Sequence, residues 1–291
     1  MKGKGRRNAP PAPKPSADTG HLPEGLVVSH LGQGLAVECP DGQILLCQTR
    51  RRLGDVAVGD RVTWTPSEDG EQGRVEAVLP RRSVLTRPGY AGKTRVVAAN
   101  LDRVFVVVSA SPAPDWLLVD QYLAVCEFRG IPAEIVYNKI DLAADETAAL
   151  AELADYVRIG YPGHPVSARS GRGVAALQNA LHGHCSMLAG QSGVGKSSLT
   201  NALLPDKNLR TGEISERSGL GRHTTTAATL YHLPGGGDLI DSPGVAVFGL
   251  AGINGQDLAW GYREFQPRIA QCRFNDCRHT HDKGCAVRAA M

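Results

Sequence analysis

The segment from Gly190 to Ser198 contains the residue types that bind a phosphate group. Gly190 and Gly195 are followed by Lys196 and Ser197 in the spacing of a phosphate-binding loop. Glycines let backbone N–H groups curl around a phosphate, a lysine reaches the terminal phosphates, and a hydroxyl suits a Mg²⁺ ligand. The candidate nucleotide-binding residues of this segment are Gly190, Gln191, Ser192, Gly193, Val194, Gly195, Lys196, Ser197 and Ser198.

The residues on either side of this loop are typical of a strand and a helix. Residues 185–189 predict a short buried strand, and residues 198–204 predict a helix. A helix that begins at the loop directs its free N–H groups and its partial positive charge towards an anion. We therefore expect the chain to bind a nucleotide; the alternative is a simple glycine-rich turn.

Asn138, Lys139 and Asp141 form a second motif, at the end of another predicted strand. The carboxylate of Asp141 can accept hydrogen bonds from both N1–H and the exocyclic amine of guanine, a pattern that adenine does not offer. The amide of Asn138 can bond the N7 and O6 side of the base. Ser167 and Ala168 fit a loop that supports the base, with the Ala168 N–H towards the guanine oxygen. Together with the phosphate loop, this motif favours GTP and GDP.

Two further stretches indicate a magnesium ion beside the nucleotide. Asp241 ends an apolar segment and is followed three residues later by Gly244, which suits an aspartate that holds Mg²⁺ through water and a backbone N–H for the γ-phosphate. Thr225, or next to it Thr224, is expected to complete the magnesium shell with Ser197. The alternatives are an edge strand for the threonines and a plain turn for the aspartate segment.

The residue after Gly244 bears on catalysis. Many GTPases place a glutamine there to orient the attacking water, whereas this chain has Val245, which cannot hold a water molecule. We therefore expect slow intrinsic hydrolysis. The orienting group is either His223, whose neutral imidazole can position water near physiological pH, or a group of a partner. The alternative for His223 is a solvent-facing loop histidine.

Alternating strand and helix patterns predict a doubly wound α/β domain over residues 96–249. Its main elements are expected at residues 101–108, 116–129, 133–137, 145–156 and 165–166. In ordinary small GTPases the phosphate loop precedes the Asn-Lys-x-Asp motif, but here the order is reversed. The same sheet can form if the chain is circularly permuted, because domain termini usually lie at the surface. The permutation also sets the segment after Gly244 against a C-terminal module, which suggests coupling.

Residues 22–86 show short alternating segments separated by turns, which predict a five-stranded barrel. The strands are expected at residues 24–28, 34–38, 43–47, 61–65 and 73–78. Clustered arginines such as Arg50, Arg51 and Arg52 favour an oligonucleotide-binding (OB) barrel, with an SH3-like barrel as second choice and a purely structural barrel as the alternative. Residues 88–95 are expected to be a linker, and the basic residues 1–21 a disordered arm.

The C-terminal module, residues 250–291, carries a metal-binding pattern. Cys272, Cys277 and Cys285 lie within fourteen residues, together with His279 and His281. Thiolate and imidazole ligands favour a closed tetrahedral zinc site, with either histidine as the fourth ligand; the alternative is a redox or incidental cluster.

Composition limits the classes of protein to be considered. The chain has 291 residues, of which 42% are hydrophobic, enough for two or three compact units. It has neither an apolar run of transmembrane length nor a signal-peptide pattern. We therefore expect a cytoplasmic, monomeric protein without membrane contact; the formal net charge of +3 adds little.

The order of these motifs from residue 22 to residue 291 resembles the RsgA family, also called YjeQ or YloQ, which are circularly permuted GTPases acting on the small ribosomal subunit. The resemblance rests on the barrel, Asn138 to Asp141, the phosphate loop, the stretch from Gly221 to Thr226, Asp241 to Gly244 and the cysteine motif. The family's Cys-x4-Cys-x-His-x5-Cys spacing selects His279 over His281.

The resemblance implies an OB barrel, a permuted GTPase core and a zinc domain. It also implies binding to ribosomal RNA, a role in late maturation of the small subunit, and GTP hydrolysis stimulated by that subunit. Family members usually continue past the last cysteine with a helical segment, whereas this sequence ends at Met291, which suggests a shortened zinc domain. The competing hypothesis is an RNA-binding module whose GTP site is regulatory and turns over negligibly.

Overall fold

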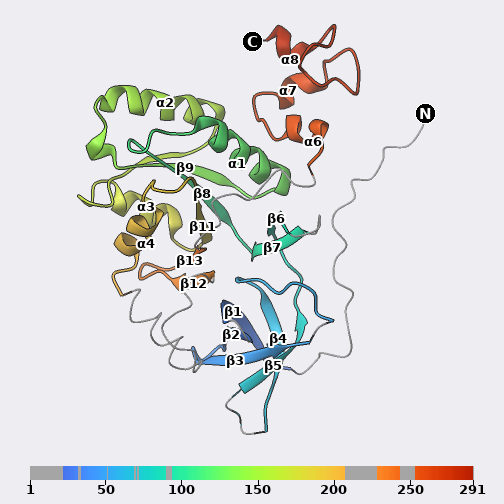
Figure 1. Ribbon diagram of the computed structural model, residues 1–291, viewed down its shortest axis with the longest axis vertical. Helices are drawn as coiled ribbons and strands as arrows, with labels where there is room; N and C mark the ends of the chain where they lie inside the picture. The colour runs from blue at the N-terminus through green and yellow to red at the C-terminus, as the bar shows by residue number, and fades with distance from the viewer. Residues whose placement is uncertain are drawn as a thin grey trace.

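The chain folds into a β-barrel, an α/β unit and a small helical module at the C-terminal end (Figure 1). This computed structural model describes residues 22–31, 34–50, 52–68, 70, 72–89, 94–206, 228–242 and 253–290. The expected arm, residues 1–21, and the residues from 207 to 227 and from 243 to 252 lie outside the described part.

The N-terminal barrel is closed and has the predicted OB topology. Its strands are β1 (Glu24–Leu31), β2 (Gly34–Glu38), β3 (Ile44–Thr49), β4 (Arg61–Pro66) and β5 (Gln72–Val78). They pair in the order β1-β2-β3-β5-β4, and β1 also pairs with β4, which closes the barrel. A bulge between Val27 and Ser29 bends β1 so that it can serve both neighbours. Alternate side chains, among them Val37, Val62 and Trp64, fill the interior.

The α/β unit is built on a mainly parallel sheet. Its strands are β8 (Arg103–Ser109), β9 (Ala133–Asn138), β10 (Gly163–Pro165), β11 (Cys185–Ala189), β12 (Thr229–His232) and β13 (Asp238–Asp241). The spatial order is β10-β9-β8-β11-β13-β12, and β12 alone among these runs antiparallel to its neighbour β13. The phosphate-loop strand β11 lies between β13 and β8, which comes before it in the chain. This arrangement confirms the permuted order.

Helices cover both faces of this sheet (Figure 1). They are α1 (Trp116–Arg129), α2 (Glu146–Ile159), α3 (Val174–Leu181) and α4 (Lys196–Leu203), with a short 3-10 helix, η2 (Ile140–Leu142). Strand β8 is apolar from Val104 to Val108 because it packs on both sides. Val106 lies in the cluster that contains α1 residues, and Val107 in the cluster that contains residues of α3 and α4.

Local capping sets the ends of the helices. Asp115 and Asp145 accept backbone N–H groups at the starts of α1 and α2, and Gly130 and Gly160 end them in left-handed conformations. Helix α1 has the predicted bounds. Helix α2 runs three residues past the expected end, up to Gly160, and α4 starts two residues earlier than expected, at Lys196.

The expected linker at residues 88–95 is wrong at its two ends. Pro88 ends β6 (Val84–Pro88), and Thr94 begins β7 (Thr94–Ala99). These strands pair antiparallel, with Pro88 opposite Thr94. The physical reason is that Leu85 and Ala98 are buried in the main core, so this stretch contributes packing as well as connection.

Backbone contacts join the barrel to the α/β unit at strand β1 and at Gly59. The barrel strand β1 pairs with β12 through Ser29 and Thr229, which makes one continuous sheet of both units. At the second contact, Gly59 has φ 89° and passes so close to Ala99 that a Cβ would lie 2.2 Å from the Ala99 oxygen. The side chain of Asn100 donates to the Gly59 carbonyl at 2.8 Å. Only glycine fits at position 59.

The C-terminal module contains α6 (Gly255–Trp260), α7 (Gln266–Ile269) and α8 (Ala286–Ala289). It docks on helix α1: Gly261 lies against the backbone of Ala124, and Arg263 pairs with Glu127 and donates to the Gly160 carbonyl. The described contacts therefore tie this module to α1 and to the end of α2. Among the residues described, no helix is both long enough and apolar enough to cross a membrane.

Candidate nucleotide site and metal centre

The loop between β11 and α4 has the backbone of a phosphate cradle. Gly190 and Gly195 have φ values of 136° and 92°, which other residues rarely adopt. A Cβ on Gly190 would lie 2.2 Å from the Val107 oxygen, and one on Gly195 would lie 2.4 Å from Nδ2 of Asn138. A side chain at either position would therefore collide with Val107 or Asn138. The two glycines let the loop lie close to β8 and β9.

Lys196 begins helix α4 and points back into the loop. Its Nζ donates to the carbonyl oxygens of Gly190 at 2.7 Å and of Gln191 at 2.8 Å. Burial lowers the pKa of Lys196, and the nearby carboxylate of Asp241 opposes that shift. The lysine is thus held inside the loop, on the side of β13, where a phosphate would meet it.

Asn138 joins the base motif to the phosphate loop. The side chain is buried at the end of β9 and donates from Nδ2 to the Val194 carbonyl at 2.9 Å. Its Oδ1 accepts the Ala168 backbone N–H at 3.2 Å. The structure therefore brings Asn138 and Ala168 together with the loop. The Ala168 N–H, expected to face the guanine oxygen, donates to Asn138 instead, and the Asn138 amide, expected to face the base, bonds Ala168 and Val194. Ser167 is fully buried and fixes the same turn by accepting the Ser170 N–H.

Lys139 and Gln191 fasten a third segment, which none of the sequence motifs includes. Lys139 Nζ donates to the carbonyls of Gly193 at 2.6 Å and of Ser111 at 2.5 Å. Gln191 accepts the Asp115 N–H at 3.2 Å and donates to the Ala113 carbonyl at 3.3 Å. The loop from β8 to α1 therefore packs on the phosphate loop. The sequence could have indicated this segment, because it follows the carboxyl end of the central parallel strand β8, where ligands of such sheets bind.

Asp141 lies in η2 with an exposed side chain, beyond the buried Asn138. An exposed carboxylate at this position can meet the edge of a base without a desolvation cost from the core. Of the remaining loop residues, Ser192, Gly193 and Ser198 are at least partly exposed, as is Ser197, and Val194 is buried beneath the loop.

On the magnesium side, the structure describes Ser197 and Asp241. Ser197 is in the first turn of α4, and Asp241 ends β13, next to the loop strand β11. Thr225, its alternative Thr224, Gly244 and the candidate catalytic His223 lie outside the described residues. A hydroxyl and a half-buried carboxylate beside neighbouring strand ends are donors that Mg²⁺ accepts.

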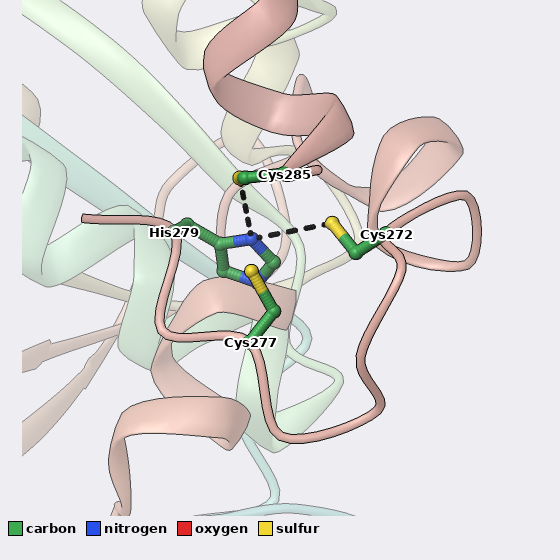
Figure 2. A group of neighbouring side chains, drawn as sticks. All are labelled: Cys272, Cys277, His279 and Cys285. Carbon is green, nitrogen blue, oxygen red and sulfur yellow. Dashed lines mark hydrogen bonds between the residues drawn. The ribbon is translucent and has the colours of Figure 1, made fainter. Parts of the chain in front are cut away.

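The C-terminal module brings four sulfur and nitrogen ligands together (Figure 2). Cys272, Cys277, His279 and Cys285 offer ligand atoms that all lie within 4.8 Å of one another. His279 is half-buried within this group, whereas His281 is exposed, so the cluster contains the histidine that the family spacing selects. Desolvation raises the pKa of Cys285, but hydrogen bonds from the Arg288 backbone N–H and from His279 outweigh it and lower that pKa to about 7.

The spacing of these donors fits a tetrahedral zinc ion. With Zn–S of about 2.3 Å and Zn–N of about 2.0 Å, tetrahedral ligands place sulfur and nitrogen about 3.5 Å apart. His279 Nδ1 lies 3.6 Å from Cys272 Sγ and 3.5 Å from Cys285 Sγ. Cys277 Sγ completes the set, with all four ligand atoms within 4.8 Å of one another, and three sulfurs with one imidazole nitrogen suit a closed structural site.

Comparisons with known proteins place this geometry in a family. A family model described as RsgA GTPase matches residues 78–251. The small ribosomal subunit biogenesis GTPase RsgA of Azotobacter vinelandii is 46% identical over 280 residues, covering 94% of this chain and 81% of the relative. The protein of the same name from Mannheimia succiniciproducens is 46% identical over 277 residues, covering 94% of this chain and 79% of the relative.

Solved structures give the same result. YjeQ from Thermotoga maritima has 34% sequence identity and a TM-score of 0.74, covering 93% of this chain and 91% of that one. YloQ, a circularly permuted GTPase, has 27% identity and a TM-score of 0.70, covering 95% and 90%. The family model, the relatives and the sheet order agree, and this chain belongs to the RsgA GTPase family.

Proposed function

We propose that this chain binds GTP with Mg²⁺ and hydrolyses it while acting on the small ribosomal subunit during biogenesis of that subunit. The observation that carries the proposal is the link from Asn138 to the Val194 carbonyl, which joins a guanine-reading motif to a phosphate loop. It occurs in a chain whose curated relatives are named small ribosomal subunit biogenesis GTPases.

In this proposal each nucleotide-site residue has a separate task. Asp141 reads the guanine edge, and Asn138 holds the loop and the base motif in register. Lys196 meets the terminal phosphates. Ser197 and Thr225 hold the magnesium ion directly, and Asp241 does so through water. Gly244 offers a backbone N–H to the γ-phosphate.

The slow step is proposed to depend on the partner. Val245 cannot orient water, so hydrolysis without the subunit is expected to be slow. His223, which precedes the magnesium threonine by two residues, is the candidate within the chain for positioning the attacking water.

Contact with ribosomal RNA is assigned to the barrel. Arg52 exposes its side chain on the barrel, and Arg61 begins β4 with an exposed side chain. Arg50 and Arg74 are exposed as well, and both pair with Glu76. Arginine side chains attract nucleic-acid phosphates, and barrels of the OB type bind oligonucleotides. The basic residues 1–21 can add to that attraction. The proposal also includes a structural zinc ion bound by the Cys272 cluster. The protein is proposed to be a monomer located in the cytoplasm.

The proposal is tested by nucleotide-dependent association with purified subunits. The protein is sedimented with small or large ribosomal subunits in the presence of GDP or of a non-hydrolysable GTP analogue. We expect it to sediment with the small subunit, more strongly with the analogue than with GDP, and not with the large subunit. Lys196→Ala should lose the nucleotide dependence. Equal sedimentation with both subunits, or with both nucleotides, contradicts the proposal.

A further inference from the structure

Strand β12 belongs to the α/β sheet and to the barrel at the same time. It pairs antiparallel with β13 on one side and with β1 of the barrel on the other (Figure 1). On the β13 side, Thr229 is directly opposite Asp241, the candidate magnesium residue. In sequence, β12 follows residues 207–227, which include Thr225 and His223. The strand therefore connects the barrel with Asp241, and in sequence it directly follows the segment that contains Thr225.

The first end of β12 is held by a buried serine of the barrel. Ser29 is 2% exposed and lies opposite Thr229 in the ladder. Its hydroxyl donates to the Ala228 carbonyl at 3.2 Å and lies 3.1 Å from the Thr229 hydroxyl. Ala228 directly follows residues 207–227, the segment with the candidate catalytic residues. Ser29 of the barrel therefore bonds the chain immediately after that segment.

The second end of β12 is held by two ionic hydrogen bonds. His232 Nδ1 lies 2.6 Å from Asp238 Oδ1 on β13, and His232 Nε2 lies 2.6 Å from Glu38 Oε2 at the end of the barrel strand β2. The hydrogen bonds to Asp238 and Glu38 raise the pKa of His232 to about 10. The ring is therefore charged at physiological pH and donates to one carboxylate from each unit, a stronger contact than a neutral pair.

Short strands depend on such contacts. Strand β12 has four residues, and its ladder with the barrel contains a single pair, Ser29 opposite Thr229. Side chains of β1 and β2 hold both ends of β12, so its position is defined relative to the barrel. A shift of the barrel is then passed to Ala228 and, through the Thr229 to Asp241 pairing, to the magnesium side of the nucleotide site.

We propose that Glu38 and His232, together with the Ser29 contact, couple the barrel to the nucleotide site, so that RNA bound by the barrel accelerates GTP hydrolysis through β12. Glu38 and His232 are positioning residues, because they act through Thr229 and Asp241. The inference rests on the proposed function, since it assigns a route for stimulation by the small subunit.

The first test separates stimulation from basal turnover. Glu38→Gln keeps the size of the side chain and removes the charge on the barrel side only. We expect turnover with saturating small subunits to fall by about fivefold or more, while turnover without subunits changes by less than about twofold. The matched control is Glu24→Gln, the same substitution at an exposed position of β1, which should leave both rates unchanged. An unchanged stimulated rate, or a proportional fall in both rates, overturns the inference.

A double-mutant cycle tests whether the two residues act as one device. Because both substitutions break the same contact, the double variant Glu38→Gln with His232→Gln should be no slower in the stimulated reaction than His232→Gln alone. Effects that multiply would mean that the residues act independently and would overturn the coupling. The conservative replacement keeps a hydrogen-bonding side chain at position 232, so folding can be checked by the unchanged basal rate.

Amide hydrogen exchange on the free protein does not depend on the ribosome. The peptide spanning residues 228–242 should exchange faster in Glu38→Gln than in the wild type, and Glu24→Gln should match the wild type. Equal exchange in all three proteins overturns the restraint of β12 by the barrel. If the wild type shows no stimulation by small subunits, the proposed function fails, and the exchange result alone then decides whether the barrel holds β12.

Discussion

A Cβ atom placed on Gly195 would lie 2.4 Å from Nδ2 of Asn138. The phosphate loop and the base motif are therefore in direct contact, and the contact depends on a position without a side chain. The same amide nitrogen donates to the Val194 carbonyl, one residue before this glycine. A disturbance of either residue is expected to reach both the phosphates and the base.

Gly195→Ala should damage nucleotide binding more than it damages the fold elsewhere. Alanine at φ 92° costs about 1–2 kcal/mol in backbone strain alone, and here its methyl group also displaces Asn138. We expect GTP affinity to fall by about tenfold or more, measured by equilibrium titration. Gly183→Ala is the matched control, because Gly183 has φ 73° and no atom lies within 4 Å of the place that its methyl group would occupy. Equal GTP affinity in the two variants would contradict the account.

Asp141→Asn should change the base preference of the site. The amide presents a donor to guanine N1–H and a suitable partner to a carbonyl of xanthine, so GTP should bind more weakly and xanthosine triphosphate more tightly. A competition titration measures both. Lys196→Ala serves as the control, since loss of a phosphate contact should weaken both nucleotides alike. An unchanged preference in Asp141→Asn removes the case for Asp141 as the base reader.

We predict that two histidines of the C-terminal module differ in their effect on zinc binding. His279→Ala should lower the zinc content from one ion per chain and speed proteolysis within residues 253–290, because binding energy at such a site is folding energy. His281→Ala, at an exposed position outside the cluster, should retain zinc and resist proteolysis like the wild type. Zinc is measured by elemental analysis. Equal metal content and equal proteolysis in the two variants would rule out His279 as a ligand.

His232 should make stability depend on pH in the alkaline range. Hydrogen bonds to Asp238 and Glu38 raise its pKa from 6.5 in the unfolded chain to about 10, so the folded state holds the proton more tightly. Its stabilising contribution is complete below pH 6.5 and is lost as the pH rises towards 10. Urea unfolding at several pH values should show the advantage of the wild type over His232→Gln shrinking across this window. A constant difference would show that the imidazole is not held as a charged group.

Much of the site could be predicted from sequence because its chemistry is local. The phosphate loop needs glycines, Lys196 and Ser197 in a fixed spacing, and the four metal ligands lie within fourteen residues. Strands such as β11 have a short apolar run of the kind that packs inside a parallel sheet. Residue types alone therefore predict these features.

The rest depends on contacts between distant parts of the chain. Glu38 and His232 are 194 residues apart in sequence, and Gln191 meets Asp115 across 76 residues. No spacing rule connects such pairs before the sheet order is known. The pairing of Pro88 with Thr94 could not be predicted, because proline usually marks an edge or a break in a strand. The limits of the three units, at residues 22–86, 96–249 and 250–291, stay predictions.

Multiple-turnover phosphate release from GTP, with and without purified small ribosomal subunits, tests the central claim most directly. We predict slow release by the protein alone and release about tenfold faster or more with small subunits. Large subunits should give no increase, and Lys196→Ala should remain at the background rate. Release that stays at that background with small subunits present would contradict the account and would favour an RNA-binding module whose GTP site does not turn over.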